Sequence, residues 1–201
     1  MKRKANALKL DGISGMIPCQ NMHDDKTDLT HAIEQSASNP TAFKPVYEAY
    51  FLRVFRYCLR RVGCLEEAED LTSVVFTRAL SNIASYRGGS FPAWVFRIAH
   101  NVLVNHLRNK RVMIPLENAE QLGIVDDPLF RLIDVEERQH VNRLIASLSD
   151  EQRNLLSLRI ASRLSAKEIG EVIGKSEGAV RVAIHRIIQQ LRTAWDEEEE
   201  R

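Results

Sequence analysis

Apolar residues recur along most of this chain at the three- and four-residue spacing of amphipathic helices. The pattern is clearest near the C-terminus, where one stripe contains Val180, Ile184, Ile187, Ile188 and Leu191. Similar stripes lie at about 40–62, 65–85 and 90–109, and no run of strand-like alternation stands out. The pattern therefore predicts an all-α fold.

Helix-start signals divide the C-terminal part of the chain. Two capping boxes are present, Ser149 with Gln152 and Ser165 with Glu168. Gly174 suits the left-handed end of one helix, and Ser176 can cap the next. Helices of about 8 and 17 residues would then meet at a tight turn, which is the arrangement of a helix-turn-helix.

The last predicted helix has a polar side opposite its apolar stripe. This side presents Gly178, Arg181, Val182, His185, Arg186 and Gln189. A helix of this kind fits the major groove, where Arg reads guanine and other side chains meet thymine methyls or phosphates. Periodicity alone leaves open an ordinary amphipathic helix whose charges face solvent.

The N-terminal half predicts a separate helical domain over residues 39–112. Its third helix, capped by Ser90 and ending near Asn109, carries a polar ridge. The ridge consists of Arg97, Asn101, Asn105 and Arg108. The polar, Pro-containing stretch 113–134 is interpreted as a flexible linker to a second domain at 135–195, which opens with a helix from about Leu129.

The two ends of the chain are interpreted as accessory segments. Residues 1–38 lack sustained periodicity and predict a flexible arm with a short helix around 29–37. Residues 196–201 are acidic and predict a frayed, solvated tail. Residues 41–113 carry a net charge of +6 and residues 135–192 carry +3, separated by an acidic stretch. Two basic blocks suggest two modules that contact a polyanion.

Several classes of protein are disfavoured by the sequence. No apolar run approaches the roughly 18 residues that span a bilayer, and no signal peptide is evident, so a cytoplasmic protein is expected. The cysteines, Cys19, Cys58 and Cys64, form no CxxC pair, and a metal site is not expected. P-loop, GxSxG, HExxH and dinucleotide motifs are missing, so neither catalysis nor a cofactor is expected.

Two blocks of residues resemble the extracytoplasmic-function (ECF) sigma factors, small members of the bacterial sigma-70 superfamily. The first block includes Ala68-Glu69-Asp70-Leu71, Val75-Phe76, Ala93-Trp94, Ile98-Ala99, Asn101 and Leu107-Arg108. The second includes Gln152-Arg153, Leu158-Arg159, Glu168-Ile169, Ser176-Glu177-Gly178 and His185-Arg186. No single motif is specific, but the order, size and spacing of the two blocks are.

The resemblance implies a factor that binds core RNA polymerase, recognises −35 and −10 promoter DNA, and helps to melt the −10 region. It implies −35 contacts by Ser176, Arg181, Val182, His185 and Arg186. It implies −10 contacts by Arg87, Arg97, Asn101, Asn105 and Arg108. Asp70, Ser73 and Val74 fall where the family docks on polymerase, although Ser73-Val74 replaces a frequent Gln-Glu pair.

Two alternatives remain open at this stage. A conventional helix-turn-helix regulator with an N-terminal effector or dimerisation domain would carry many of the same patterns. Control could come from an anti-sigma protein, as for many members of the family, or from the N-terminal arm. The sequence does not choose between these means of control.

Overall fold

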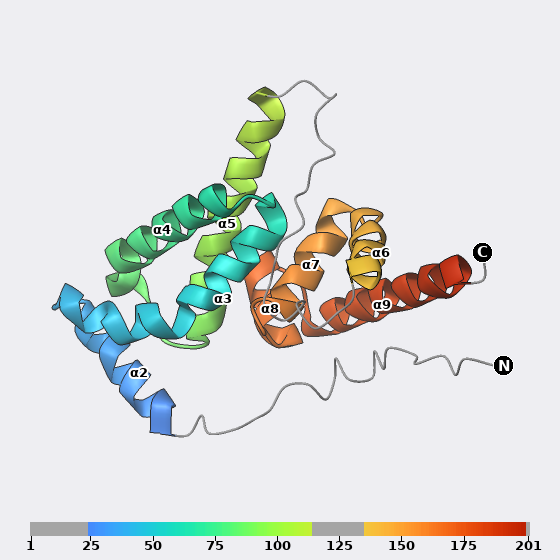
Figure 1. Ribbon diagram of the computed structural model, residues 1–201. Coiled ribbons are helices and arrows are strands. Elements are labelled where there is room, and N and C mark those ends of the chain that lie inside the picture. The colour runs from blue at the N-terminus through green and yellow to red at the C-terminus, as the bar shows by residue number, and fades with distance from the viewer. Residues whose placement is uncertain (1–23, 114–134, 200–201) are drawn as a thin grey trace.

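The computed structural model describes residues 24–113 and 135–199, which are helical throughout apart from turns and contain no strand (Figure 1). The N-terminal part comprises α2 (Asp24–Ser36), the 3-10 turn η1 (Pro40–Phe43), α3 (Lys44–Val62), α4 (Leu65–Asn82), the 3-10 turn η2 (Ile83–Ser85) and α5 (Phe91–Met113). The C-terminal part comprises α6 (Val135–Ala146), α7 (Asp150–Ile160), α8 (Ala166–Ile173) and α9 (Glu177–Glu199). The all-α fold with a C-terminal helix-turn-helix is thus confirmed.

The first domain is built on three helices, α3, α4 and α5, that pack on one another. Asn39 accepts a hydrogen bond from the Thr41 amide and opens η1, and Gly63 ends α3 with a left-handed φ of 71°. The apolar stripe predicted at about 65–85 is buried: it consists of Ala68, Leu71, Val75 and Ala79 of α4 and Ile83 of η2. The apolar stripe predicted at about 40–62 is buried at Val46, Tyr50, Val54, Tyr57 and Cys58 of α3. Tyr47 instead lies on the surface, with its ring against Phe51 and Phe76.

The N-terminal helix α2 is part of this packing. Ala32 and Ile33 are buried, and α2 contacts η1, α3 and η2. The sequence predicted only a short helix around 29–37, whereas α2 begins five residues earlier, at Asp24. The prediction was short because a helix that buries so few residues has a weak apolar stripe.

The second domain reproduces the helix starts that the sequence predicts. Both capping boxes form with both of their hydrogen bonds, at Ser149 and at Ser165. Gly174 ends α8 with φ of 72°, and Ser176 accepts a hydrogen bond from the Ala179 amide at the start of α9. Between them, the Lys175 carbonyl oxygen passes within 2.4 Å of the position that a Cβ would take on Gly170, so the turn closes tightly over α8.

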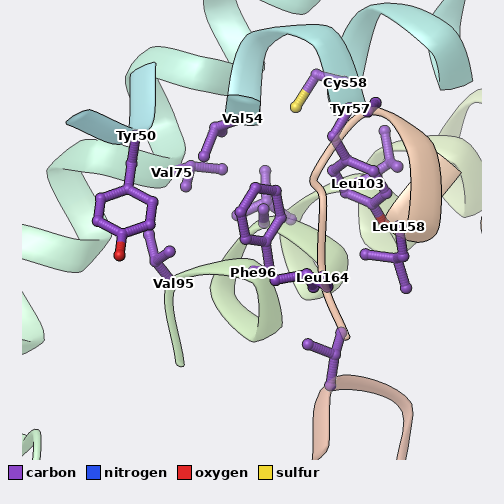
Figure 2. Close-up of a cluster of buried hydrophobic side chains, with 14 of the residues drawn as sticks. Tyr50, Val54, Tyr57, Cys58, Val75, Val95, Phe96, Leu103, Leu158 and Leu164 are labelled. Atoms are coloured by element: carbon purple, nitrogen blue, oxygen red, sulfur yellow. The ribbon is translucent and has the colours of Figure 1, made fainter. Parts of the chain in front are cut away.

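One buried cluster runs through both domains. Leu158 of α7 and Leu164 of the α7–α8 loop are fully buried, in the same cluster as Tyr57 and Phe96 of the first domain. Figure 2 shows the two leucines beside those aromatic side chains. The two domains are therefore packed together, which the interpretation as separate modules did not predict.

Some helix ends differ from the predictions. The third long helix, α5, runs to Met113 rather than to about Asn109. The last helix, α9, has 23 residues and continues through the acidic residues to Glu199, so the expected frayed tail is helical over 196–199. Residues 114–134 of the linker predicted at 113–134, which include the expected helix start near Leu129, lie outside the described residues, as do residues 1–23 of the arm predicted at 1–38.

Candidate nucleic-acid interface

The outer face of α9 is exposed, and the opposite face of the helix packs against the second domain. Val180 and Ile187, two residues of the predicted stripe, are buried against the second domain. The residues predicted to contact −35 DNA lie on the solvent side: Ser176, Arg181, Val182, His185 and Arg186. The structure therefore brings this whole set together on one surface.

That surface combines charge with an apolar contact point. The side chain of Arg181 is 71% exposed and pairs with Glu177 one turn earlier. The apolar side chain of Val182 is 50% exposed, and a Cβ at Gly178 would meet open space. A small, open helix start flanked by Arg and an exposed branched methyl group can enter a major groove and contact guanine and thymine edges.

The predicted polar ridge on α5 is also at the surface. Arg97, Asn101, Asn105 and Arg108 are all exposed, and Arg108 donates a hydrogen bond to Asn105 Oδ1 at 3.1 Å. Val95 and Val102 are buried on the opposite side and orient the ridge outward. The structure places Arg97 apart from the rest in one respect, because its Nη2 donates to the Glu171 carbonyl oxygen of α8 at 2.7 Å.

The loop before α5 is shaped by two glycines. Gly88 and Gly89 have φ of 89° and 90°, values that favour glycine. The Tyr86 hydroxyl donates to the Gly89 carbonyl at 2.7 Å, and Arg87 donates to the Ala84 carbonyl at 2.8 Å. The loop is thus a defined shape beside the ridge.

Trp94 follows this loop on the first turns of α5. Its ring lies 5.6 Å from that of Tyr86 and 5.3 Å from that of Phe91, measured between centroids. The side chain is half-buried, and it lines a cavity of about 540 Å³ together with the glycine loop, Arg97 and α8. An aromatic ring with one open side can stack on an unpaired base.

The predicted polymerase-docking residues share the outer face of α4. Asp70, Ser73 and Val74 are exposed, while Leu71 and Val75 face the core. Val74 is 40% exposed, and Leu65 at the start of the same helix is 61% exposed. An exposed valine beside a carboxylate suits a docking surface with an apolar centre and a polar rim.

Sequence reasoning missed a set of residues that join the two domains. Arg53 lies over the rings of Tyr50 and Phe96 and donates from Nε to the Ser162 carbonyl at 3.0 Å. Burial is the main cause of the lowered pKa of Arg53. Arg61, whose side chain is 5% exposed, pairs with Asp150 at 2.7 Å.

A third contact of this set is a buried hydroxyl. Tyr57 donates from its hydroxyl to Asn154 Oδ1 at 2.8 Å and lies 3.2 Å from His100 Nδ1. Burial raises the pKa of the Tyr57 hydroxyl, and burial followed by the nearby Arg61 charge lowers the pKa of His100. In the sequence, Arg53, Tyr57 and Arg61 are marked only as polar side chains in or next to the apolar stripe of a helix. Side chains that face solvent give the same pattern.

Other kinds of site find no support in the described parts of the chain. Over residues 24–113 and 135–199, no group of three or more His, Cys, Asp or Glu side chains is placed to hold a metal ion. Within the same ranges, none of the helices combines the length and the apolar character needed to cross a membrane. Burial raises the pKa of the Cys58 thiol to about 12, so this cysteine is a packed core residue.

Comparisons with known proteins match both domains. The family described as sigma-70 region 2 matches residues 46–112, and sigma-70, region 4 matches residues 138–191. The chain is 31% identical over 164 residues to the ECF RNA polymerase sigma factor SigW of Bacillus subtilis, covering 75% of this chain and 87% of SigW. It is 30% identical over 173 residues to the ECF RNA polymerase sigma factor BldN of Streptomyces coelicolor, covering 83% of this chain and 66% of BldN.

Solved structures share the fold. The sigma factor RpoE of Bartonella quintana, in complex with the anti-sigma factor NepR, matches with a TM-score of 0.62 and 19% identity, over 77% of this chain and 96% of that chain. CnrH in complex with the cytosolic domain of CnrY matches with a TM-score of 0.63 and 20% identity, over 84% of this chain and 97% of that chain.

Proposed function

This chain belongs to the extracytoplasmic-function sigma factors, and from that premise we propose how its surfaces direct core RNA polymerase to promoters. It binds core polymerase, recognises −35 and −10 elements and helps to melt the −10 region. The observation that carries the proposal is the pairing of sigma-70 regions 2 and 4, each with its polar face exposed. The protein acts in the cytoplasm with polymerase and performs no chemistry of its own.

The −35 element is read by the outer face of α9. Arg181 lies one turn closer to the start of this helix than Arg186, so it is the better placed for a bidentate contact with guanine. Arg186 and His185 then hold phosphates, and Val182 contacts a thymine methyl. Ser176 completes the start of the helix with a hydroxyl that caps it.

The −10 element is handled as single-stranded DNA by the first domain. Asn101 and Asn105 offer amide groups to base edges, and Arg97, Arg108 and Arg87 neutralise the DNA backbone. The half-exposed Trp94 and the glycine loop provide a surface on which an unpaired base can stack. Melting follows because the protein binds the separated strand more tightly than the duplex.

Polymerase docks on the outer face of α4 through Asp70, Ser73 and Val74. Because Val74 is apolar and exposed, the centre of this contact is hydrophobic and Asp70 supplies its charged rim. An anti-sigma factor is a further proposed partner. One solved sigma factor with the same fold, RpoE of Bartonella quintana, is in a complex of that type, with the anti-sigma factor NepR.

The deciding experiment is promoter-specific run-off transcription with sigma-free core polymerase and the purified chain. We expect transcripts of defined start site only when the chain is added, from a promoter library selected with the holoenzyme. Specific duplex binding by the free protein together with no run-off product would contradict the proposal. It would instead indicate a conventional helix-turn-helix regulator.

A further inference from the structure

The last turns of α5 carry part of the polar ridge but make few apolar contacts. Among the side chains described for this helix, the last buried ones are Val102 and Leu103. Beyond them, Val104 is exposed, and Leu107 packs on the core only in part. In Figure 1 the end of α5 extends beyond the other helices of the first domain. Apolar packing therefore does little to fix the direction of this part of the helix.

One carboxylate of α4 holds these turns. Glu67, in the first turn of α4, accepts a hydrogen bond from Lys110 Nζ at its Oε1, over 2.6 Å. Its Oε2 lies 3.0 Å from His106 Nε2. His106 and Lys110 are four residues apart, so they lie one above the other on a single face of α5. Glu67 thus contacts two successive turns of α5, one with each oxygen.

The surroundings of Glu67 favour its charged form. Burial alone would raise the pKa of this carboxyl group, but the hydrogen bonds from Lys110 and His106, together with their charges, outweigh burial, and the pKa is lowered. All three side chains are partly buried. Hydrogen bonds to a charged acceptor are stronger than those between neutral groups, so this contact can replace the missing apolar support.

Glu67 acts on the side of α5 that is turned away from the ridge. At 3.6 residues per turn, His106 and Lys110 each lie about 160° around the helix from Arg108. Arg108 and Asn105 are exposed, and Arg108 donates to Asn105 Oδ1. A helix is stiff over two turns, so fixing one side of it fixes where the opposite side points.

We propose that Glu67 is a positioning residue for the −10 strand: through His106 and Lys110 it fixes the last turns of α5 and so places Asn105 and Arg108 against the DNA. The inference rests on the function proposed above, because it takes the ridge as the surface that binds the strand. Helix α4 then serves two partners, with Asp70 facing polymerase and Glu67, one turn earlier, supporting the strand-binding helix.

A matched pair of variants separates positioning from charge. Glu67→Gln keeps the shape of the side chain and removes its charge. Glu66→Gln makes the same change one residue earlier, at an exposed position in the same helical turn. Each variant removes one negative charge from the start of α4, so charge alone predicts the same small rise in DNA affinity for both. Loss of positioning predicts a fall in affinity for Glu67→Gln only.

Amide hydrogen exchange of the free, full-length protein tests the contact without DNA. Glu67→Gln should speed exchange over residues 104–110 and leave residues 91–103 as in the wild type, because only the last turns depend on this carboxylate. Glu66→Gln should match the wild type over both ranges. Equal exchange over 104–110 in Glu67→Gln and in the wild type would overturn the inference.

Fluorescence anisotropy tests the effect on the strand. Each full-length variant would be bound at saturating concentration to core polymerase and titrated with a fluorescein-labelled single strand that carries the −10 sequence of a promoter selected in the run-off assay. Glu67→Gln should bind this strand about fivefold more weakly, the upper end for a partly exposed ion pair. Glu66→Gln should bind it as tightly as the wild type or slightly more tightly. A rise in affinity for Glu67→Gln would overturn the positioning role.

A double-mutant cycle shows whether Glu67 acts through the ridge. With Asn105→Ala and Arg108→Ala already present, Glu67→Gln should change the strand affinity by less than about twofold, whereas with Arg87→Ala it should keep its full effect. A full loss in the ridge-deficient background would indicate a general loss of structure and overturn the inference. Wild-type protein that fails in run-off transcription contradicts the proposed function. Transcription by the wild type, with equal strand affinity of Glu67→Gln, contradicts only the role of Glu67.

Discussion

Replacing Gly170 with Ala should distort the turn that positions the promoter-reading helix. A Cβ at this position would lie 2.4 Å from the Lys175 carbonyl oxygen, which is backbone and cannot rotate away. Reaching an acceptable contact requires a shift of about half an ångström or more between α8 and the turn that leads into Ser176. Overpacking of this kind costs about 1–3 kcal/mol.

Helix propensity partly offsets that cost. Alanine in place of glycine within a helix stabilises it by about 0.5–1 kcal/mol. The net expectation for Gly170→Ala is a loss of about 1 kcal/mol in the free energy of unfolding. Gly178, near the start of α9, is the matched control, because an added Cβ there meets nothing within 4 Å. Gly178→Ala should therefore leave the protein equally stable or more stable by up to about 1 kcal/mol.

Urea denaturation monitored by circular dichroism measures the stability of both variants. Run-off transcription from promoters with substituted −35 elements measures their promoter recognition. Gly170→Ala should lose stability and −35-dependent activity together, since the displaced turn carries the start of α9. Gly178→Ala adds a methyl group on the exposed face, so any loss of activity there should come without a loss of stability. A Gly170→Ala variant at least as stable as the wild type would refute the claim that the Lys175 carbonyl leaves no room for a Cβ at Gly170.

Three further predictions concern charged groups. Arg181→Ala should weaken promoter binding by about 1–3 kcal/mol and relax the preference at one −35 base pair. Arg186→Ala should weaken binding to all sequences and reduce the slope of log affinity against log salt concentration by about one unit. If both variants keep the wild-type preference and activity in a −35 library, α9 does not read the promoter. Asp70→Arg should weaken association with core polymerase in a fluorescence titration, whereas Glu48→Arg, an exposed control on α3, should not. An Asp70→Arg affinity equal to that of the wild type would exclude Asp70 from docking. Burial, followed by the Arg61 charge, lowers the pKa of His100, so a state in which the two domains separate and expose this ring binds the extra proton. The contact between the domains should therefore be intact above the ordinary histidine pKa of about 6.5 and weaken as pH falls below it. The polar groups near this ring are Tyr57, Asn154 and Arg61. Small-angle X-ray scattering curves that stay unchanged between pH 7.5 and 5.5 would contradict the prediction.

Most of the fold was predictable because its signals are local. The capping boxes at Ser149 and Ser165 and the stripe from Val180 to Leu191 are each contained within a few helical turns. The candidate DNA-binding faces followed from the same periodicity, since a polar ridge opposite a buried stripe must face outward. Their assignment to promoter elements needed the resemblance to a family.

The interdomain contacts were not predictable, because nothing local marks them. Arg61 lies in a run of basic residues at the end of α3, where a solvated charge is the ordinary expectation, and its partner is 89 residues away. Arg53 and Ser162 are separated by 109 residues. The ends of α9 and α2 were misjudged for a different reason: acidic and sparsely apolar segments give weak helical signals even where neighbouring helices support them.

The long sequence separation between the residues that join the two domains also sets an order in time during synthesis. A ribosome adds about 5–20 residues per second, and N-terminal domains fold first. The first domain ends at Met113, and the roughly 50 residues from there to Ser162 therefore take about 2–10 s to make. For that interval each new first domain exists with its polar ridge and its polymerase-docking helix complete, but without the second domain that packs on α3 and α5. A newly made molecule can meet polymerase before its two domains have packed together.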